Sequence, residues 1–118
     1  MPVTTHLDIE ERDDVAIIRF REPRLTDPMA IEELGGQLYQ VLEFKNSSKL
    51  VIDLSNVEFL PSAAIGKLIS LNRKAKGCQA SLRVCGLQQG VRDIFHMCAL
   101  DRVFEVRDDV RAAVASFA

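Results

Sequence analysis

The stretch VIDLSNVEFLPSAAIG, residues 51–66, decides the fold of this chain. An apolar run ends at Asp53, passes through a polar turn and becomes apolar again at Ser62, where we expect a helix to begin. The stretch therefore predicts a buried strand, a short loop and a helix start. Backbone N–H groups and the helix dipole favour negative charge at such a start, so Ser62 is a candidate for phosphorylation. Its other role, and the one we expect, is to cap the helix.

Strands and helices alternate on both sides of this stretch. A run that alternates between apolar and polar residues at 7–10 and a mostly apolar run at 15–20 predict an opening β-hairpin, and three shorter apolar runs predict the remaining strands. In the second run we expect one face to carry Ala16, Ile18 and Phe20 and the other face to carry Val15 and Ile17. These five strands are expected at 7–10, 15–20, 50–52, 81–85 and 103–106. With four helices between and after them, the order is β-β-α-β-α-β-α-β-α. The chain is therefore predicted to be an α/β domain with a small mixed, mostly parallel sheet and covering helices.

The helices are predicted from their start and stop signals. Thr26-Asp27-Pro28 supplies a capping side chain followed by proline in the first turn. Two glycines, Gly35 and Gly36, interrupt the helix that follows and suggest close packing there. Gly77 is expected to end the second helix, and Asp108 or Asp109 to cap the last one.

Length and composition limit the classes of protein that this chain can represent. Its 118 residues fit one domain, spanning 1–118, and its net charge of −2 with mixed signs argues against a nucleic-acid surface. No apolar run approaches the ~20 residues of a membrane-spanning helix. The first residues do not resemble a signal peptide, so we expect a cytoplasmic protein. The oligomeric state is not predicted.

No pattern of catalytic or metal-ligating residues is present. The two histidines, His6 in an N-terminal segment expected to fray and His96, have no partners at metal-ligand spacing. Of the three cysteines, Cys85 and Cys98 lie in apolar sequence and are expected to be small buried side chains. The carboxylates are scattered over a turn, a helix face and a helix start, so we propose no acid/base pair. We expect no enzyme activity, no metal and no cofactor.

The turn after Asp53 resembles a motif of the STAS family, the domain shared by sulphate transporters and anti-sigma factor antagonists. The family pattern runs approximately D-x-S-x-V-x-F-[ILM]-D-S-[ST]-G-x-G across a strand, a loop and a helix start. This chain matches it without a gap at Asp53, Ser55, Val57, Phe59, Leu60, Ser62 and Gly66. The stretches LRVCGL, VRDIF and LDRVF, at 82–87, 91–95 and 100–104, resemble the second half of the family. The resemblance thus covers nearly the whole chain.

The resemblance also implies a function. Antagonists of this kind, when unphosphorylated, bind an anti-sigma factor that is a GHKL-type serine kinase, and so release the sigma factor. The kinase phosphorylates the Ser or Thr at the third place of D-S-[ST]-G, and about two added negative charges separate the complex. This chain has Pro61 where the family has the aspartate of D-S-[ST]-G, Ala63 where it has the phosphorylated residue, and Ala64 where it has the glycine. Because alanine has no hydroxyl, we expect the usual switch to be absent, which leaves Ser62 as the candidate acceptor.

We therefore predict a non-enzymatic regulatory protein that docks a kinase-type anti-sigma factor. The predicted contact surface consists of the loop and helix start within 56–67, together with Thr26 and Asp27 at the start of the preceding helix. Its residues are Thr26, Asp27, Asn56, Glu58, Pro61, Ser62, Ala63, Ala64, Ile65 and Lys67. Two alternatives stay open: a non-phosphorylatable STAS scaffold module in a larger signalling assembly, and a domain that binds a small ligand or anion at the helix start.

Overall fold

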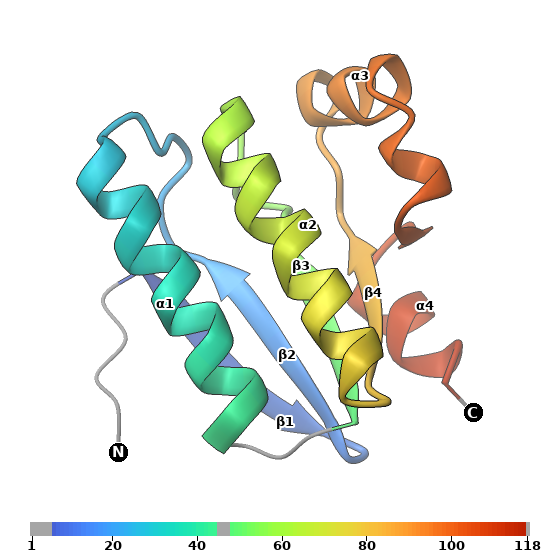
Figure 1. The fold of residues 1–118 in the computed structure, drawn as a ribbon. Coiled ribbons are helices and arrows are strands. Elements are labelled where there is room, and N and C mark those ends of the chain that lie inside the picture. The colour runs from blue at the N-terminus through green and yellow to red at the C-terminus, as the bar shows by residue number, and fades with distance from the viewer. Residues whose placement is uncertain (1–5, 45–47, 118) are drawn as a thin grey trace.

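The computed structural model describes residues 6–44 and 48–117, and it confirms the predicted order of strands and helices (Figure 1). The strands are β1 (Leu7–Arg12), β2 (Val15–Phe20), β3 (Lys49–Asp53), β4 (Ser81–Cys85) and β5 (Glu105–Arg107). The helices are α1 (Pro28–Phe44), α2 (Ser62–Gly77), α3 (Gln89–Met97) and α4 (Val110–Ala115), with a short 3-10 helix, η1 (Leu100–Arg102).

The strands form one five-stranded sheet in the order β1-β2-β3-β4-β5. The hairpin strand β1 is antiparallel to β2, whereas the pairs β2–β3, β3–β4 and β4–β5 are parallel. Asp13 and Asp14 turn the hairpin with φ angles of 52° and 68°, a left-handed conformation that aspartate tolerates better than most side chains. The sheet is therefore mixed and mostly parallel, as the sequence predicts.

Helices cover the two faces of the sheet unequally. Helices α1 and α2 lie side by side over one face, and α4 lies over the other (Figure 1). Because successive strand residues point to opposite faces, Ile18 and Ile52 join the large core, whereas Ile17 and Val51 join a smaller cluster with Ala113 of α4. The prediction of a buried strand before the loop is confirmed, because β3 contributes side chains to the clusters on both faces of the sheet.

The parallel crossovers bring three strand ends and three helix starts to one end of the molecule. Strands β2, β3 and β4 each lead into a loop and then into α1, α2 and α3 (Figure 1). We call this end the carboxyl edge, and its loops are residues 21–27, 54–61 and 86–88. Helix α2 and its preceding loop, predicted as the contact surface, lie at its centre.

The predicted bounds of the final strand are wrong, the predicted end of the second helix is confirmed, and close packing is found at one of the two glycines. The final strand is Glu105–Arg107 rather than 103–106, because η1 occupies Leu100–Arg102 and Phe104 turns into the core. Gly77 is the last residue of α2, as predicted, and the residue in the left-handed conformation after the helix is Gln79, with a φ of 61°. Close packing occurs at Gly35, which faces the Lys67 side chain, whereas Gly36 faces open space.

Within residues 6–44 and 48–117, no helix is both long enough and apolar enough to cross a bilayer.

Candidate functional site

Asp53 organises the turn that leads out of β3. It is buried, its Oδ1 accepts a hydrogen bond from the Ser55 backbone N–H at 3.0 Å, and its Oδ2 pairs with Arg19 Nε at 3.0 Å. Arg19 also donates to Glu10 at 2.7 Å, which raises the pKa of Arg19 and lowers that of Glu10. The first aspartate of the motif thus fixes the loop direction by charge-assisted hydrogen bonds.

The loop after Asp53 is held by buried apolar side chains. Leu54, Val57 and Leu60 are at most 1% exposed, so the loop follows a fixed path over the core. The backbone N–H groups of Glu58 and Phe59 donate to the Pro23 carbonyl at 2.9 and 3.3 Å. The loop between β2 and α1 therefore supports the loop before α2, although 35 residues separate Pro23 from Glu58 along the chain.

The loop after β4 packs against the same turn. Gly86 has a φ of 73°, and a Cβ added there would lie 2.8 Å from Asp53 Oδ1 and 3.0 Å from Ser55 Cβ. Two residues later, Gln88 Nε2 donates to the Ser55 carbonyl at 2.7 Å. The loop 86–88 thus connects β4 to α3 and also supports the turn after Asp53.

The predicted capping role of Ser62 is wrong. Pro61 is the N-cap residue of α2, with φ −70° and ψ 159°, and its carbonyl accepts from the Ile65 N–H at 3.0 Å. Ser62 is the first helical residue, where its side chain is exposed and caps no backbone N–H group. Pro61 combines the φ that its ring fixes with an extended ψ, so it is the N-cap residue and the helix starts one residue earlier than a serine cap would require.

The start of α1 lies beside this loop and is capped as predicted. Asp27 Oδ1 accepts from the Met29 backbone N–H at 3.1 Å, with Pro28 in the first turn. Further along α1, Glu32 pairs with Lys67 of α2 at 3.0 Å, which ties the two helices together.

The structure brings most predicted contact residues to the carboxyl edge. Exposed residues of this set are Thr26, Asp27, Asn56, Glu58, Ser62 and Ala63, and partly exposed ones are Pro61, Ile65 and Lys67. Ala64 is fully buried, so its side chain belongs to the core and not to a surface.

Two large apolar side chains at this edge were missed by the sequence reasoning. Phe59 is 41% exposed and Met29 is 69% exposed. In the sequence Phe59 is one position of the motif, and Met29 stands at an ordinary helix start. No sequence signal distinguishes an exposed Phe from a buried one in a loop, because the exposure of a loop side chain depends on how distant segments pack around it.

Cys98 and His6 differ from their predicted surroundings, whereas Cys85 is buried as predicted. Cys85 is buried, and burial raises its thiol pKa to about 12, but Cys98 is exposed after α3 instead of being buried. His6 is not frayed: its ring contacts two glutamates. His96 is exposed. Among the described residues, no three His, Cys, Asp or Glu side chains are placed to hold a metal ion.

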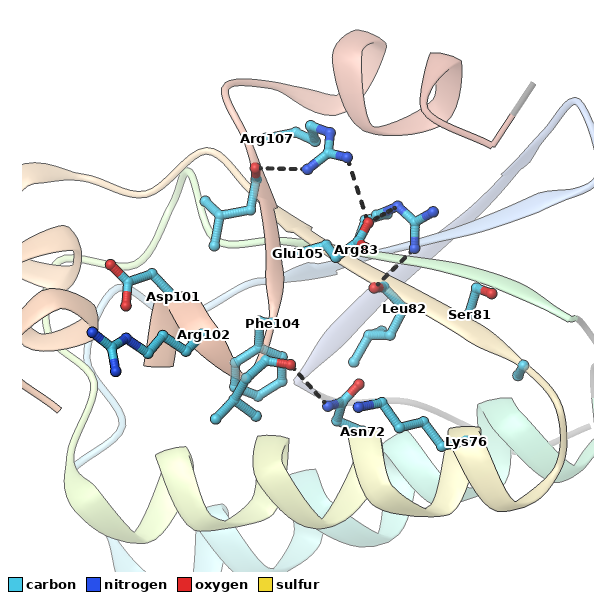
Figure 2. Close-up of a pocket in the computed structure, with 13 residues that line it drawn as sticks. Asn72, Lys76, Ser81, Leu82, Arg83, Asp101, Arg102, Phe104, Glu105 and Arg107 are labelled. Atoms are coloured by element: carbon cyan, nitrogen blue, oxygen red, sulfur yellow. Dashed lines mark hydrogen bonds and ion pairs between the residues drawn. The ribbon is translucent and has the colours of Figure 1, made fainter. Parts of the chain in front are cut away.

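A separate notch of about 720 Å³ opens along β4 and β5, beside the C-terminal half of α2 (Figure 2). Arg83 and Arg107 on its rim both pair with Glu105, at 3.0 and 3.4 Å. Asn72 at its base donates to the Val103 carbonyl at 3.3 Å. These polar groups therefore satisfy one another, and the notch contains none of the predicted contact residues.

Comparisons with known proteins identify the kind of domain. The family model described as the STAS domain matches residues 6–113. A Bordetella bronchiseptica protein named as the anti-sigma factor antagonist BtrV is 26% identical over 86 residues, 73% of each chain. The structure is similar to that of an anti-sigma-factor antagonist (STAS) domain protein from Planctomyces limnophilus, with a TM-score of 0.84 at 18% identity, covering 98% and 100% of the two chains. It is also similar to a chain of the stressosome, described as a signal integration and transduction hub (TM-score 0.71, 17% identity, coverage 92% and 94%).

Proposed function

This chain belongs to the STAS domain family, and we propose that it is a regulatory binding protein of the anti-sigma factor antagonist type that docks a GHKL-type serine kinase. The proposal is supported by the name of the Bordetella relative and by the carboxyl edge itself. A kinase partner that uses ATP would place the complex in the cytoplasm.

The observation that carries the proposal is the exposed helix start. Phe59 stands 41% exposed on a loop held by buried anchors, followed by exposed Ser62 and Ala63 on the first turn of α2. A partly exposed aromatic side chain next to small side chains is the kind of surface on which a partner can bury apolar area. The proposed contact surface comprises Thr26, Asp27, Met29, Asn56, Glu58, Phe59, Pro61, Ser62, Ala63, Ile65 and Lys67.

Alanine at position 63 determines how binding at this surface can be regulated. A kinase cannot place phosphate on a side chain without a hydroxyl, so contact at this position is not ended by the charge of a phosphate. Ser62 remains a candidate acceptor, because its exposed hydroxyl makes no capping bond. We propose that the chain docks its kinase without being released by modification of residue 63.

The test is binding of the purified chain to each GHKL-type kinase of the same genome, measured by calorimetry. We expect one kinase to bind the parent and Ala63→Arg to weaken binding at least about tenfold, the effect of losing ~1.4 kcal/mol. The matched control is Ala115→Arg, which makes the same change at an exposed residue of α4 on the other face. Equal binding of both variants, or no binding kinase, would refute the proposal.

The same kinase should label an Ala63→Ser variant with phosphate from ATP. Mass spectrometry of the labelled peptide distinguishes phosphate on residue 63 from phosphate on Ser62. Failure of the binding kinase to label Ala63→Ser at residue 63 would contradict the assignment of this position as the acceptor position, and dissociation of the parent complex on phosphorylation of Ser62 would identify Ser62 as the acceptor that releases the kinase.

A second candidate function is a scaffold module in a larger signalling assembly. Ala63 favours this function, because a scaffold needs no phosphoacceptor residue. A chain of the stressosome, a larger assembly, has a similar fold. Light scattering with the other STAS proteins of the same genome tests it: a stable high-mass complex without a kinase favours the scaffold.

A further inference from the structure

His6 stands at the start of β1 with both ring nitrogens next to carboxylates. Nδ1 lies 2.6 Å from Glu22 Oε1, and Nε2 lies 3.0 Å from Glu33 Oε2. Only 12% of the His6 side-chain surface is exposed. Glu22 belongs to the loop after β2 and Glu33 to the second turn of α1, so the imidazole joins three separate parts of the fold.

This geometry requires a protonated ring. An ionised carboxylate only accepts hydrogen bonds, and a neutral imidazole carries one N–H donor, so one of the two contacts would be lost in the neutral state. The imidazolium donates from both nitrogens and pairs with both charges. The hydrogen bond to Glu33 is the largest effect that raises the pKa of His6, burial opposes it, and Glu22 adds to the increase.

The segment held by His6 is the one that supports the carboxyl edge. The His6 carbonyl accepts from the Arg21 N–H at 3.0 Å, and Glu22 precedes Pro23, whose carbonyl accepts from the Glu58 and Phe59 N–H groups.

Other charged groups on the same elements have their own partners. Arg21 pairs with Asp8 of β1 at 2.8 Å, Glu32 of α1 pairs with Lys67, and Arg24 of the loop lies 3.8 Å from Glu58. Glu22 and Glu33 are therefore the carboxylates that face the ring.

We propose that protonated His6 is a latch that holds the loop 21–27 and α1 to the start of β1, and that losing this proton loosens the carboxyl edge. The folded chain binds the proton more tightly than the unfolded chain. The latch is therefore complete below the unfolded histidine pKa of about 6.5 and is lost as pH rises through the folded pKa.

The test uses the isolated chain and two independent measurements. An NMR titration of the His6 ring protons, assigned by their absence in His6→Gln, gives the folded pKa. Urea unfolding across the same pH range gives the change in the unfolding constant. By linkage, the unfolding constant of the parent must increase with pH by a factor whose decimal logarithm equals the difference between the folded and the unfolded pKa of His6. This increase must be absent in His6→Gln.

Matched glutamine variants distinguish the latch from a merely structural histidine. Glu33→Gln should lower the folded pKa of His6 and flatten the pH dependence of stability, whereas Glu32→Gln, at the neighbouring exposed position, should leave both unchanged. Hydrogen-exchange protection of the Glu58 and Phe59 amides, corrected for intrinsic rates, should fall with rising pH in the parent.

A His6 ring that titrates at the ordinary histidine value, or equal pH profiles for the two glutamine variants, would overturn the proposal. Amide protection independent of pH would equally overturn the link to the carboxyl edge. None of these results depends on a binding partner, so failure of the latch and failure of the proposed function are distinguishable.

Discussion

Replacing Gly86 with alanine tests how the motif is held in place. Gly86 has a φ of 73°, where a side chain costs about 1–2 kcal/mol. The added Cβ would also lie 2.8 Å from Asp53 Oδ1 and 3.1 Å from the Ser55 backbone nitrogen. Neither is the far end of a flexible side chain, because Asp53 is paired with Arg19 and buried, so the neighbours must move at a cost of about 1–3 kcal/mol. We expect Gly86→Ala to destabilise the fold by about 3 kcal/mol.

Two other glycines supply matched controls for the same substitution. Gly36 lies exposed in α1 with no heavy atom within 4 Å of an added Cβ, so Gly36→Ala should stabilise the protein by about 0.5–1 kcal/mol. At Gly35 the Cβ would lie 2.8 Å from Lys67 Cδ, a flexible side chain that can move aside, so we expect a change near zero.

Urea unfolding followed by circular dichroism measures all three variants. The midpoint should fall for Gly86→Ala, rise for Gly36→Ala and move little for Gly35→Ala, with the dependence on urea unchanged. A Gly86→Ala protein as stable as the parent would refute the account of the Asp53 turn, since both the left-handed conformation and the contacts demand a loss.

The remaining predictions concern Asp53 and the cysteines. Asp53→Ala should cost about 2–3 kcal/mol in urea unfolding, because a buried hydrogen-bonded carboxylate is lost while Arg19 keeps Glu10. Asp8→Ala, which breaks an exposed pair with Arg21, should cost under about 1 kcal/mol, and equal losses would contradict the role of Asp53. A thiol reagent should modify Cys78 and Cys98 in the native chain and reach Cys85 only on unfolding, because Cys85 is buried with a pKa of about 12. Rapid native labelling of Cys85, seen by mass spectrometry, would show that α4 does not cover it.

Local sequence patterns were sufficient to predict side-chain faces and helix caps where these depend only on the residues of one strand or helix. The alternation in 15–20 assigned each side chain to its correct face, and Asp27 and Asp109 cap their helices as their positions indicate. The capping prediction for Ser62 failed because Pro61 has the extended backbone of the N-cap residue, which makes Ser62 the first residue of the helix.

Contacts between segments that are distant along the chain could not be predicted from the sequence. Cys98, which directly follows α3, is exposed, and so is Phe59, whose backbone N–H donates to the distant Pro23 carbonyl. His6 is ordered because Glu22 and Glu33 approach it from a loop and a helix.

The sequence by itself determined the order of elements, the strand–loop–helix motif at 51–66 and the absence of a hydroxyl at Ala63, because periodicity, turn residues and residue identity are local properties. Only the tertiary structure decided which motif side chains face outward, why Gly86 must be glycine and how His6 is held. Each of these depends on atoms that are far apart in the chain and meet only when the parallel strands bring their carboxyl ends together.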